Sequence, residues 1–140
     1  MNTVDEIELL KNNIIEQAKY YLHEFGGFYP FGAAINNLNE LKPVSVYMNT
    51  EDPSSNDVIH KLEEGMKALA NRKYYIATAI GSDVIVNLPG FKEKIDAIQI
   101  RICGIGFESK DYFIPYIKEE SSGYKYLNLH EENGTLKIFK

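Results

Sequence analysis

Apolar residues recur every three or four positions between residues 4 and 25, and this spacing constrains the fold more than any other feature of the sequence. Such spacing places side chains on one face of a helix, so it predicts an amphipathic α-helix over residues 4–25. Gly26 and Gly27 follow at once and predict its end, because glycine readily adopts the left-handed conformation that terminates helices. The stripe that would face a core consists of Ile7, Leu10, Ile14, Ala18, Tyr21, Leu22 and Phe25.

Two segments rich in aromatic and β-branched residues follow the helix, over residues 28–35 and 42–49. The polar stretch between them predicts a β-hairpin. A second helix is expected to begin at the serine pair 54–55, whose hydroxyls cap backbone amides, with Asp57 favouring its positive end, and to stop near residues 71–72. Its apolar stripe consists of Val58, Leu62, Met66 and Leu69.

Three further strands are expected in the second half of the chain, over residues 74–87, 95–107 and 112–118. Only the four residues 108–111 separate the last two, which is too short for a crossover, so these strands must run antiparallel. Beyond them, apolar and polar residues alternate, and a Glu-Glu-Asn-Gly turn at 131–134 predicts a C-terminal hairpin.

These elements predict one domain of the α+β class over residues 1–140. Their order is α-β-β-α-β-β-β followed by the C-terminal hairpin, without a repeated βαβ unit. We expect an antiparallel sheet of about five strands with both helices on one of its faces. A composition of 44% hydrophobic and 25% charged residues is normal for a folded globular domain.

The charge of the chain limits its partners. A net charge of −5 and a pI of about 5.2 oppose nucleic-acid binding, which requires a concentrated surface of lysine and arginine. The same charge suits a basic protein partner. No apolar run reaches the length of a membrane span, and the acidic first residues do not resemble a secretion signal, so we expect no membrane partner and a cytoplasmic location.

No constellation of residues in the sequence predicts catalysis, a metal site or a cofactor. The three histidines, His23, His60 and His130, lack the spacing that would bring two metal ligands together on a helix. Cys103 is the only cysteine, and burial in the core is the usual role of a free cysteine within a strand. No dinucleotide fingerprint is present. We therefore expect no cofactor and no catalytic residue.

Two surfaces are candidates for binding a protein partner. On one expected strand, side-chain alternation directs the isoleucines toward the helices and Gln99 and Arg101 toward the opposite face. The same alternation directs Tyr47 outward, and tyrosine and arginine are enriched at binding hot spots. The second candidate is the acidic surface of the second helix, which carries Glu63 and Glu64.

The face that carries Arg101 has another interpretation. The terminal residues Leu136, Ile138 and Phe139 need an apolar surface to pack on. They could fold across this face, in which case Arg101 would only make contacts within the chain. The sequence leaves both alternatives open.

The most distinctive segment is 24–34, with the sequence Glu-Phe-Gly-Gly-Phe-Tyr-Pro-Phe-Gly-Ala-Ala. Together with residues 44–47, it resembles a group of small uncharacterised bacterial proteins that share a helix, an F-Y-P-F-G-A strand and a second strand ending in tyrosine. The resemblance covers the first half of the chain and, loosely, residues 114–116, and it implies the fold. By analogy of size, charge and missing chemistry, such proteins resemble the immunity partners of bacterial toxins. The aromatic side chains of the segment are expected to supply buried area to the core.

Three hypotheses of function remain. The leading one is a non-catalytic protein-binding domain, most concretely an immunity-type inhibitor of a bacterial toxin with a basic toxin domain as partner. The second is a small ligand-binding protein or enzyme with a pocket between the first helix and the aromatic strand, using His23, Tyr29 and Tyr47. The third is a homo-oligomerisation module in which an edge strand pairs with its copy to form a homodimer.

Overall fold

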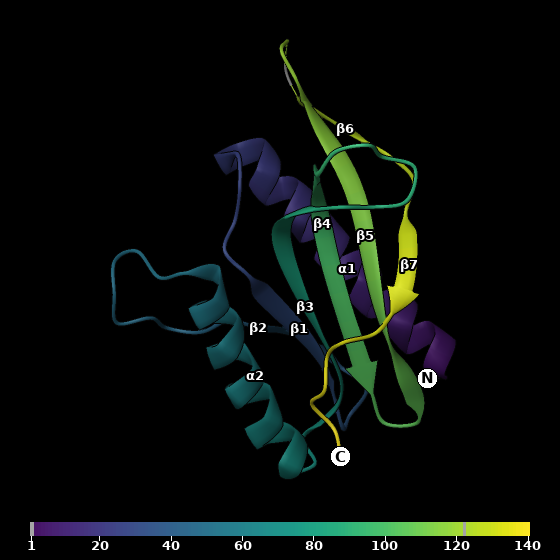
Figure 1. Ribbon diagram of the computed structural model, residues 1–140. Helices are drawn as coiled ribbons and strands as arrows, with labels where there is room; N and C mark the ends of the chain where they lie inside the picture. The colour runs from purple at the N-terminus through teal and green to yellow at the C-terminus, as the bar shows by residue number, and fades with distance from the viewer. Residues whose placement is uncertain (1, 122) are drawn as a thin grey trace.

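The computed structural model describes residues 2–121 and 123–140, and within them the chain forms two helices and one seven-stranded antiparallel sheet (Figure 1). The α+β class and the order of the first seven elements confirm the sequence prediction. In chain order the elements are α1 (Thr3–Phe25), β1 (Phe31–Asn36), β2 (Leu41–Val44), α2 (Ser55–Asn71), β3 (Tyr75–Val86), β4 (Ile95–Gly104), β5 (Phe107–Glu119), β6 (Gly123–Tyr126) and β7 (His130–Asn133).

Both helices begin and end where their local chemistry predicts. The side chain of Asn2 accepts a hydrogen bond from the Asp5 amide at 2.9 Å and caps α1, whereas Ser54 accepts from the Asp57 amide at 3.1 Å and caps α2. Gly26 ends α1 in the left-handed conformation, with φ at 77°, and its N–H donates to the Leu22 carbonyl at 2.9 Å.

The strands lie in the order β2-β1-β3-β4-β5-β6, and β7 also pairs with β5. The predicted hairpin of β1 and β2 is confirmed. In its loop, the Asn36 side chain accepts hydrogen bonds from the amides of Leu38 and Glu40, both at 2.9 Å. The pairing ends at Gly32 and Val44 because β1 begins at Phe31, so the expected extension of β2 to residue 49 has no strand to pair with.

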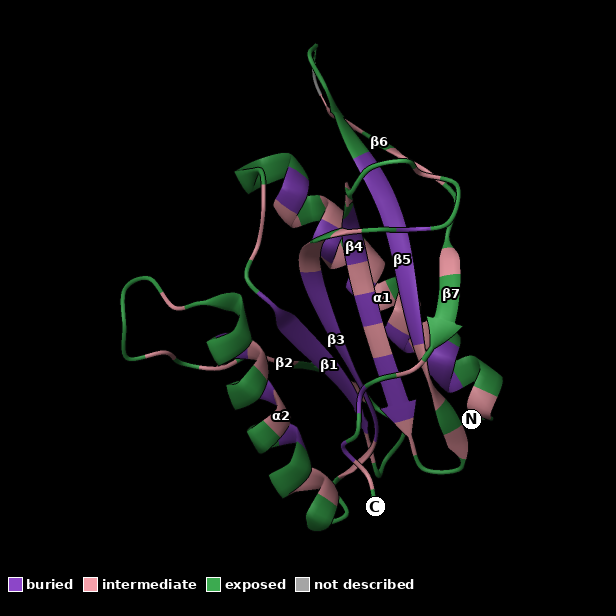
Figure 2. Ribbon diagram, in the orientation of Figure 1, coloured by how far each residue is buried: buried purple, intermediate pink, exposed green. Residues whose placement is uncertain are grey.

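The prediction that both helices pack on one face of the sheet is wrong. Residues of α1, such as Leu10 and Ile14, pack with Ala79 and Ile100 on one face. Residues of α2 pack with Ile80 and Cys103, whose side chains alternate to the opposite face. The protein therefore has three layers, with α1 behind the sheet in Figure 1 and α2 in front of it. As a consequence both faces of β1 are covered, and Figure 2 shows this strand buried along nearly its whole length.

The turn between β4 and β5 lies earlier than predicted. Gly104 pairs with Phe107, and the two residues between them form the turn, with Gly106 at a φ of 88°. Glycine accommodates this positive φ without the strain that another residue would carry. The residues 108–111, expected to form the turn, belong instead to β5.

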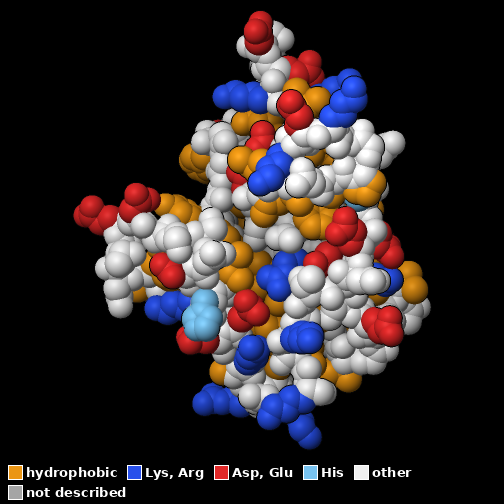
Figure 3. All heavy atoms as spheres, in the orientation of Figure 1, with side chains coloured by type: hydrophobic (Ala, Val, Ile, Leu, Met, Phe, Trp, Pro, Cys, Tyr) orange, Lys and Arg blue, Asp and Glu red, His pale blue; other side chains and the backbone are white. Residues whose placement is uncertain are grey.

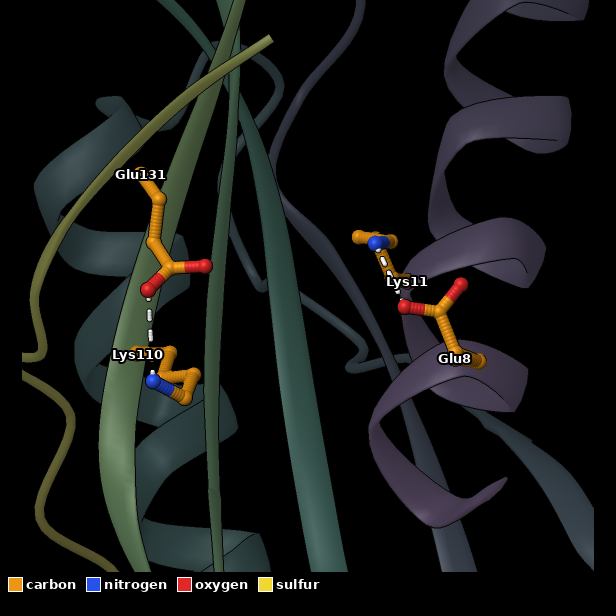
Figure 4. Close-up of polar contacts among 4 residues, drawn as sticks. All are labelled: Glu8, Lys11, Lys110 and Glu131. Carbon is orange, nitrogen blue, oxygen red and sulfur yellow. Dashed lines mark hydrogen bonds and ion pairs between the residues drawn. The ribbon is translucent and has the colours of Figure 1, made fainter. Parts of the chain in front are cut away.

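The prediction of a C-terminal hairpin is also wrong, because β6 and β7 do not pair with each other. Both run antiparallel to β5, β6 along its second half and β7 along its first half. Lys110 of β5 and Glu131 of β7 form an ion pair at 3.3 Å, which Figure 4 shows beside the separate pair of Lys11 and Glu8 on α1. The predicted turn at 131–134 thus falls mostly within β7.

After β7, the C-terminal segment (residues 134–140) folds across the face of the sheet that α2 also covers. Leu136 and Ile138 are buried there together with Met66 of α2 and Cys103 of β4. The second of the two interpretations of this face is therefore the one that the structure shows. α2 and the C-terminal segment together form the third layer.

Candidate functional site

A pocket of about 660 Å³ lies between the end of α1, the residues that lead into β1, and the start of α2. It is close to where the ligand-binding hypothesis placed one. Aromatic side chains form most of its wall, with Tyr21 and Phe25 contributed by α1 and Ser55 by α2. We call this cavity the aromatic pocket. Its complete lining is Tyr21, Phe25, Gly27, Phe28, Tyr29, Pro30, Phe31 and Ser55.

The inner wall of the aromatic pocket is continuous with the core. The Tyr21 ring meets the Phe31 ring edge to face, with centroids 5.2 Å apart, and Phe28 lies 5.5 Å from Phe31 in a similar arrangement. Phe31 is buried and packs with the residues beneath α1. Aromatic pairs in this geometry are favourable beyond the area they bury, so the wall is held in place before anything binds.

The outer rim of the aromatic pocket is exposed. Phe25 is 72% exposed although it lies on the predicted apolar stripe of α1, and Tyr29 is 50% exposed although we expected it to pack in the core. Neighbouring apolar side chains that remain exposed next to a hollow are typical of binding surfaces. The expected packing of the aromatic side chains of the motif holds for Phe31 and in part for Phe28, but not for Tyr29.

The carboxylate of Asp52 lies at this rim. The Tyr29 hydroxyl donates a hydrogen bond to Asp52 Oδ1 at 3.0 Å, and this bond raises the pKa of Tyr29 by favouring the protonated phenol. The residues that line the pocket include no lysine or arginine.

Asp83 of β3 holds the segment that forms the pocket wall. Its carboxylate accepts hydrogen bonds from the Tyr116 hydroxyl and from the Phe28 backbone N–H. Burial raises the pKa of Asp83, and the two hydrogen bonds oppose that rise by stabilising the charged form. Burial also raises the pKa of Tyr116, so its hydroxyl remains a donor. Asp83 thereby links the end of α1 to the sheet.

The residues predicted for partner binding do not form one patch. Tyr47 is 79% exposed in the loop after β2, and it shares a hollow of about 440 Å³ with Glu64. Glu64 also lies 3.3 Å from His60, and Glu63 is half-buried on the same helix. Lys61 and Lys67 lie among these carboxylates, and Figure 3 shows acidic and basic side chains intermingled over α2.

Gln99 and Arg101 lie on the face that the C-terminal segment covers. Both are half-buried. The Arg101 Nε donates to the Thr135 hydroxyl at 2.9 Å, and that hydroxyl donates to the buried carboxylate of Asp111 at 2.8 Å. Arg101 thus makes its hydrogen bond within the chain. It does not line the hollow that contains Tyr47.

The three residues of the ligand-binding hypothesis are also separated. Tyr29 lines the aromatic pocket, whereas Tyr47 lies in the hollow beside α2. His23 lines a third hollow of about 390 Å³ together with Lys118 and Tyr124. The residues that line the aromatic pocket with Tyr29 include Tyr21 and Phe25, and not Tyr47 and His23. The positions of Tyr21 and Phe25, four residues apart near the end of a helix, could have indicated a shared aromatic surface.

Comparisons of the chain with protein-family models, with curated proteins and with solved structures find no match. Within residues 2–121 and 123–140, no group of three or more histidine, cysteine, aspartate or glutamate side chains is placed to hold a metal ion. Neither of the described helices has the length and apolar character needed to cross a membrane. The aromatic pocket, with Asp52 at its rim, is the feature from which we infer a function.

Proposed function

We propose that this protein is a non-catalytic protein-binding domain and that the aromatic pocket with its rim is the centre of the interface. The observation that carries the proposal is the exposure of Phe25 and Tyr29 around a pocket of about 660 Å³. Interfaces are organised around a few aromatic side chains next to pockets that exclude water, and tyrosine is among the residue types enriched there.

In its most concrete form, the protein is an immunity-type inhibitor of a bacterial toxin. A net charge of −5 supports a basic partner, since opposite charges speed encounter and favour correct orientation. The resemblance of segment 24–34 to small bacterial proteins supports the same reading. The inhibitor would act in the bacterial cytoplasm by covering the active site of a basic toxin domain.

A second candidate function is the binding of a small molecule in the aromatic pocket. The volume of about 660 Å³ favours it, because ligand pockets are usually about 300–1,000 Å³ and mostly apolar. The two functions differ in what covers the rim. A protein partner would cover Phe25 and the surface around it, whereas a small ligand would leave the rim open.

Site-specific crosslinking in an extract of the source organism tests the proposal. A photoreactive phenylalanine analogue replaces Phe25 in one protein and Leu38 in the control. Leu38 is also 72% exposed but lies in the loop between β1 and β2, away from the pocket. We expect one basic protein to crosslink from position 25 and not from position 38, and to be identified by mass spectrometry. If that protein is a toxin, co-production of the chain should restore growth of cells that make it.

Other outcomes contradict the proposal. The same products from both positions would indicate non-specific contact, and no product from position 25 would favour the small-molecule function. A product of twice the mass of the chain would instead support homo-oligomerisation.

A further inference from the structure

The apolar wall and the charged rim of the aromatic pocket together restrict which chemical group it can bind. Its walls are apolar and aromatic, so a neutral apolar group would bury surface area against them. A cation would in addition be attracted by the negative charge at the rim. The carboxylate of Asp52 is held at the rim by the Tyr29 hydroxyl, 3.0 Å away. Because a carboxylate has about four acceptor positions, one hydrogen bond from Tyr29 leaves room for a second donor.

Basic side chains near this end of α1 are directed elsewhere. The Lys19 ammonium lies over the Tyr126 ring, 4.4 Å from its centroid, on the side of α1 that contacts β6. His23 lines the separate hollow that includes Lys118. A cation that enters the aromatic pocket would therefore meet π faces and the Asp52 carboxylate and would meet no lysine or arginine in the wall.

Among cations, the guanidinium of arginine fits this combination best. It is planar, so it stacks on aromatic rings, and it presents parallel N–H donors that match a carboxylate. It is also more weakly hydrated than an ammonium group, so it loses less on leaving water. Its aliphatic stem buries against apolar walls while the charged end remains at the polar rim.

We infer that the aromatic pocket receives an arginine side chain of the protein partner, with the guanidinium stacked on an aromatic ring of the wall and paired with Asp52. This inference rests on the proposed protein-binding function and adds the chemistry of the residue that the partner inserts. A partner of this kind carries an exposed arginine on a basic surface, which agrees with the negative charge of the chain. The arginine would be a central contact of the interface, and Phe25 would cover it from solvent.

Titration with two short peptides tests the inference by nuclear magnetic resonance. The probes are acetyl-Gly-Leu-Arg-Gly-amide and the same peptide with citrulline, a neutral analogue of arginine with nearly the same shape. We expect the arginine peptide to shift the aromatic signals of Phe25, Phe28 and Tyr29 in a saturable way and to bind at least about fivefold more tightly than the citrulline peptide, the ratio that a modest cation–π contact provides.

Two variants separate the proposed pairing from general charge attraction. Asp52→Asn removes the carboxylate at the rim, and Glu51→Gln makes the same change of net charge at the neighbouring exposed position. The preference for arginine over citrulline should fall by at least about twofold in Asp52→Asn, because the ion pair with the carboxylate is lost while stacking on the rings remains, and it should be unchanged in Glu51→Gln. An equal loss in both variants would mean that the preference comes from overall charge, and the inference would fail.

Equal binding of the two peptides, shifts confined to other parts of the surface, or no saturable shift would also overturn the inference. These results would leave the proposed function intact if the crosslinked partner still forms from position 25. The opposite pattern, arginine-selective binding without any crosslinked protein, would overturn the proposed function instead. A negative peptide titration therefore contradicts only the inference about arginine, and a negative crosslinking experiment contradicts the proposed function.

Discussion

Leu10→Ala is expected to lower the free energy of unfolding by about 2–5 kcal/mol. Leu10 has no exposed surface and packs on the sheet from the middle of the buried stripe of α1. Replacing leucine by alanine removes the transfer energy of the buried side chain and leaves a cavity, since the neighbours relax only partly. Denaturation with urea, followed by circular dichroism, measures this change.

The control variant for this prediction is Val4→Ala on the same helix. Val4 is 68% exposed, so its replacement should change the free energy of unfolding by less than about 0.5 kcal/mol. The account of the α1 layer would be contradicted if Leu10→Ala cost no more than Val4→Ala.

Leu136→Ala is expected to loosen the C-terminal segment and to expose Cys103. Leu136 is completely buried, and its cluster includes Cys103 and Met66. Cys103 is the only cysteine and is 4% exposed, so its reaction with a thiol reagent reports opening of this layer. If the substitution costs the segment about 2 kcal/mol or more, the labelling rate of Cys103 in the native protein should rise roughly thirtyfold or more.

Lys137→Ala is the matched control for Leu136→Ala, because Lys137 is the next residue and is exposed. Its labelling rate should remain close to that of the unchanged protein. A second variant, Gly134→Ala, should act like Leu136→Ala, since a Cβ at this position would overlap the backbone of Ser109. Unchanged labelling of Cys103 in both Leu136→Ala and Gly134→Ala would contradict the three-layer arrangement.

The helices, the serine that caps the start of α2 and the glycine that ends α1 could be predicted because their signals are local. The stripe of α1 lies within one continuous segment, and the residues that begin and end the helices act on amides and carbonyls a few positions away. Side-chain alternation along β4 was also predictable, and it correctly separates Ile100 from Arg101.

The faces that the helices cover depend on contacts distant in the sequence. One feature did indicate two covered faces, because β1 and, apart from Thr78, the first half of β3 lack charged residues and are mostly apolar at consecutive instead of alternating positions. A strand buried on both faces has this pattern. The alanines 77 and 79 of β3 face α1, whereas Ile80 faces α2. The expectation of a two-layer sandwich overlooked this signal.

The errors at the C-terminal end have a similar cause. The Glu-Glu-Asn-Gly stretch is typical of a turn, but β5 is 13 residues long and its edge offers hydrogen bonds along its whole length. Pairing with that edge satisfies the backbone of β6 and β7, and this outweighs the local turn preference. The polar composition of β7 reflects its exposed position at the sheet edge.

The candidate site was located only in part from the sequence. The region between the first helix and the aromatic strand was identified as one possible pocket, and Tyr29 lines it. Tyr47 and His23, which were expected beside Tyr29, line two other hollows. Only the packing of α1, β1 and α2 determines that Phe25, Phe28 and Tyr29 surround one space.

The dissociation constant of the partner recovered by crosslinking tests the central claim most directly. It is measured by isothermal titration calorimetry for the unchanged protein, for Phe25→Ala and for Leu38→Ala, with folding of each variant checked by circular dichroism. If the aromatic pocket is the centre of the interface, Phe25→Ala should weaken binding at least about tenfold, and Leu38→Ala should leave it within about twofold. Equal affinities for all three proteins would place the interface elsewhere and contradict the claim.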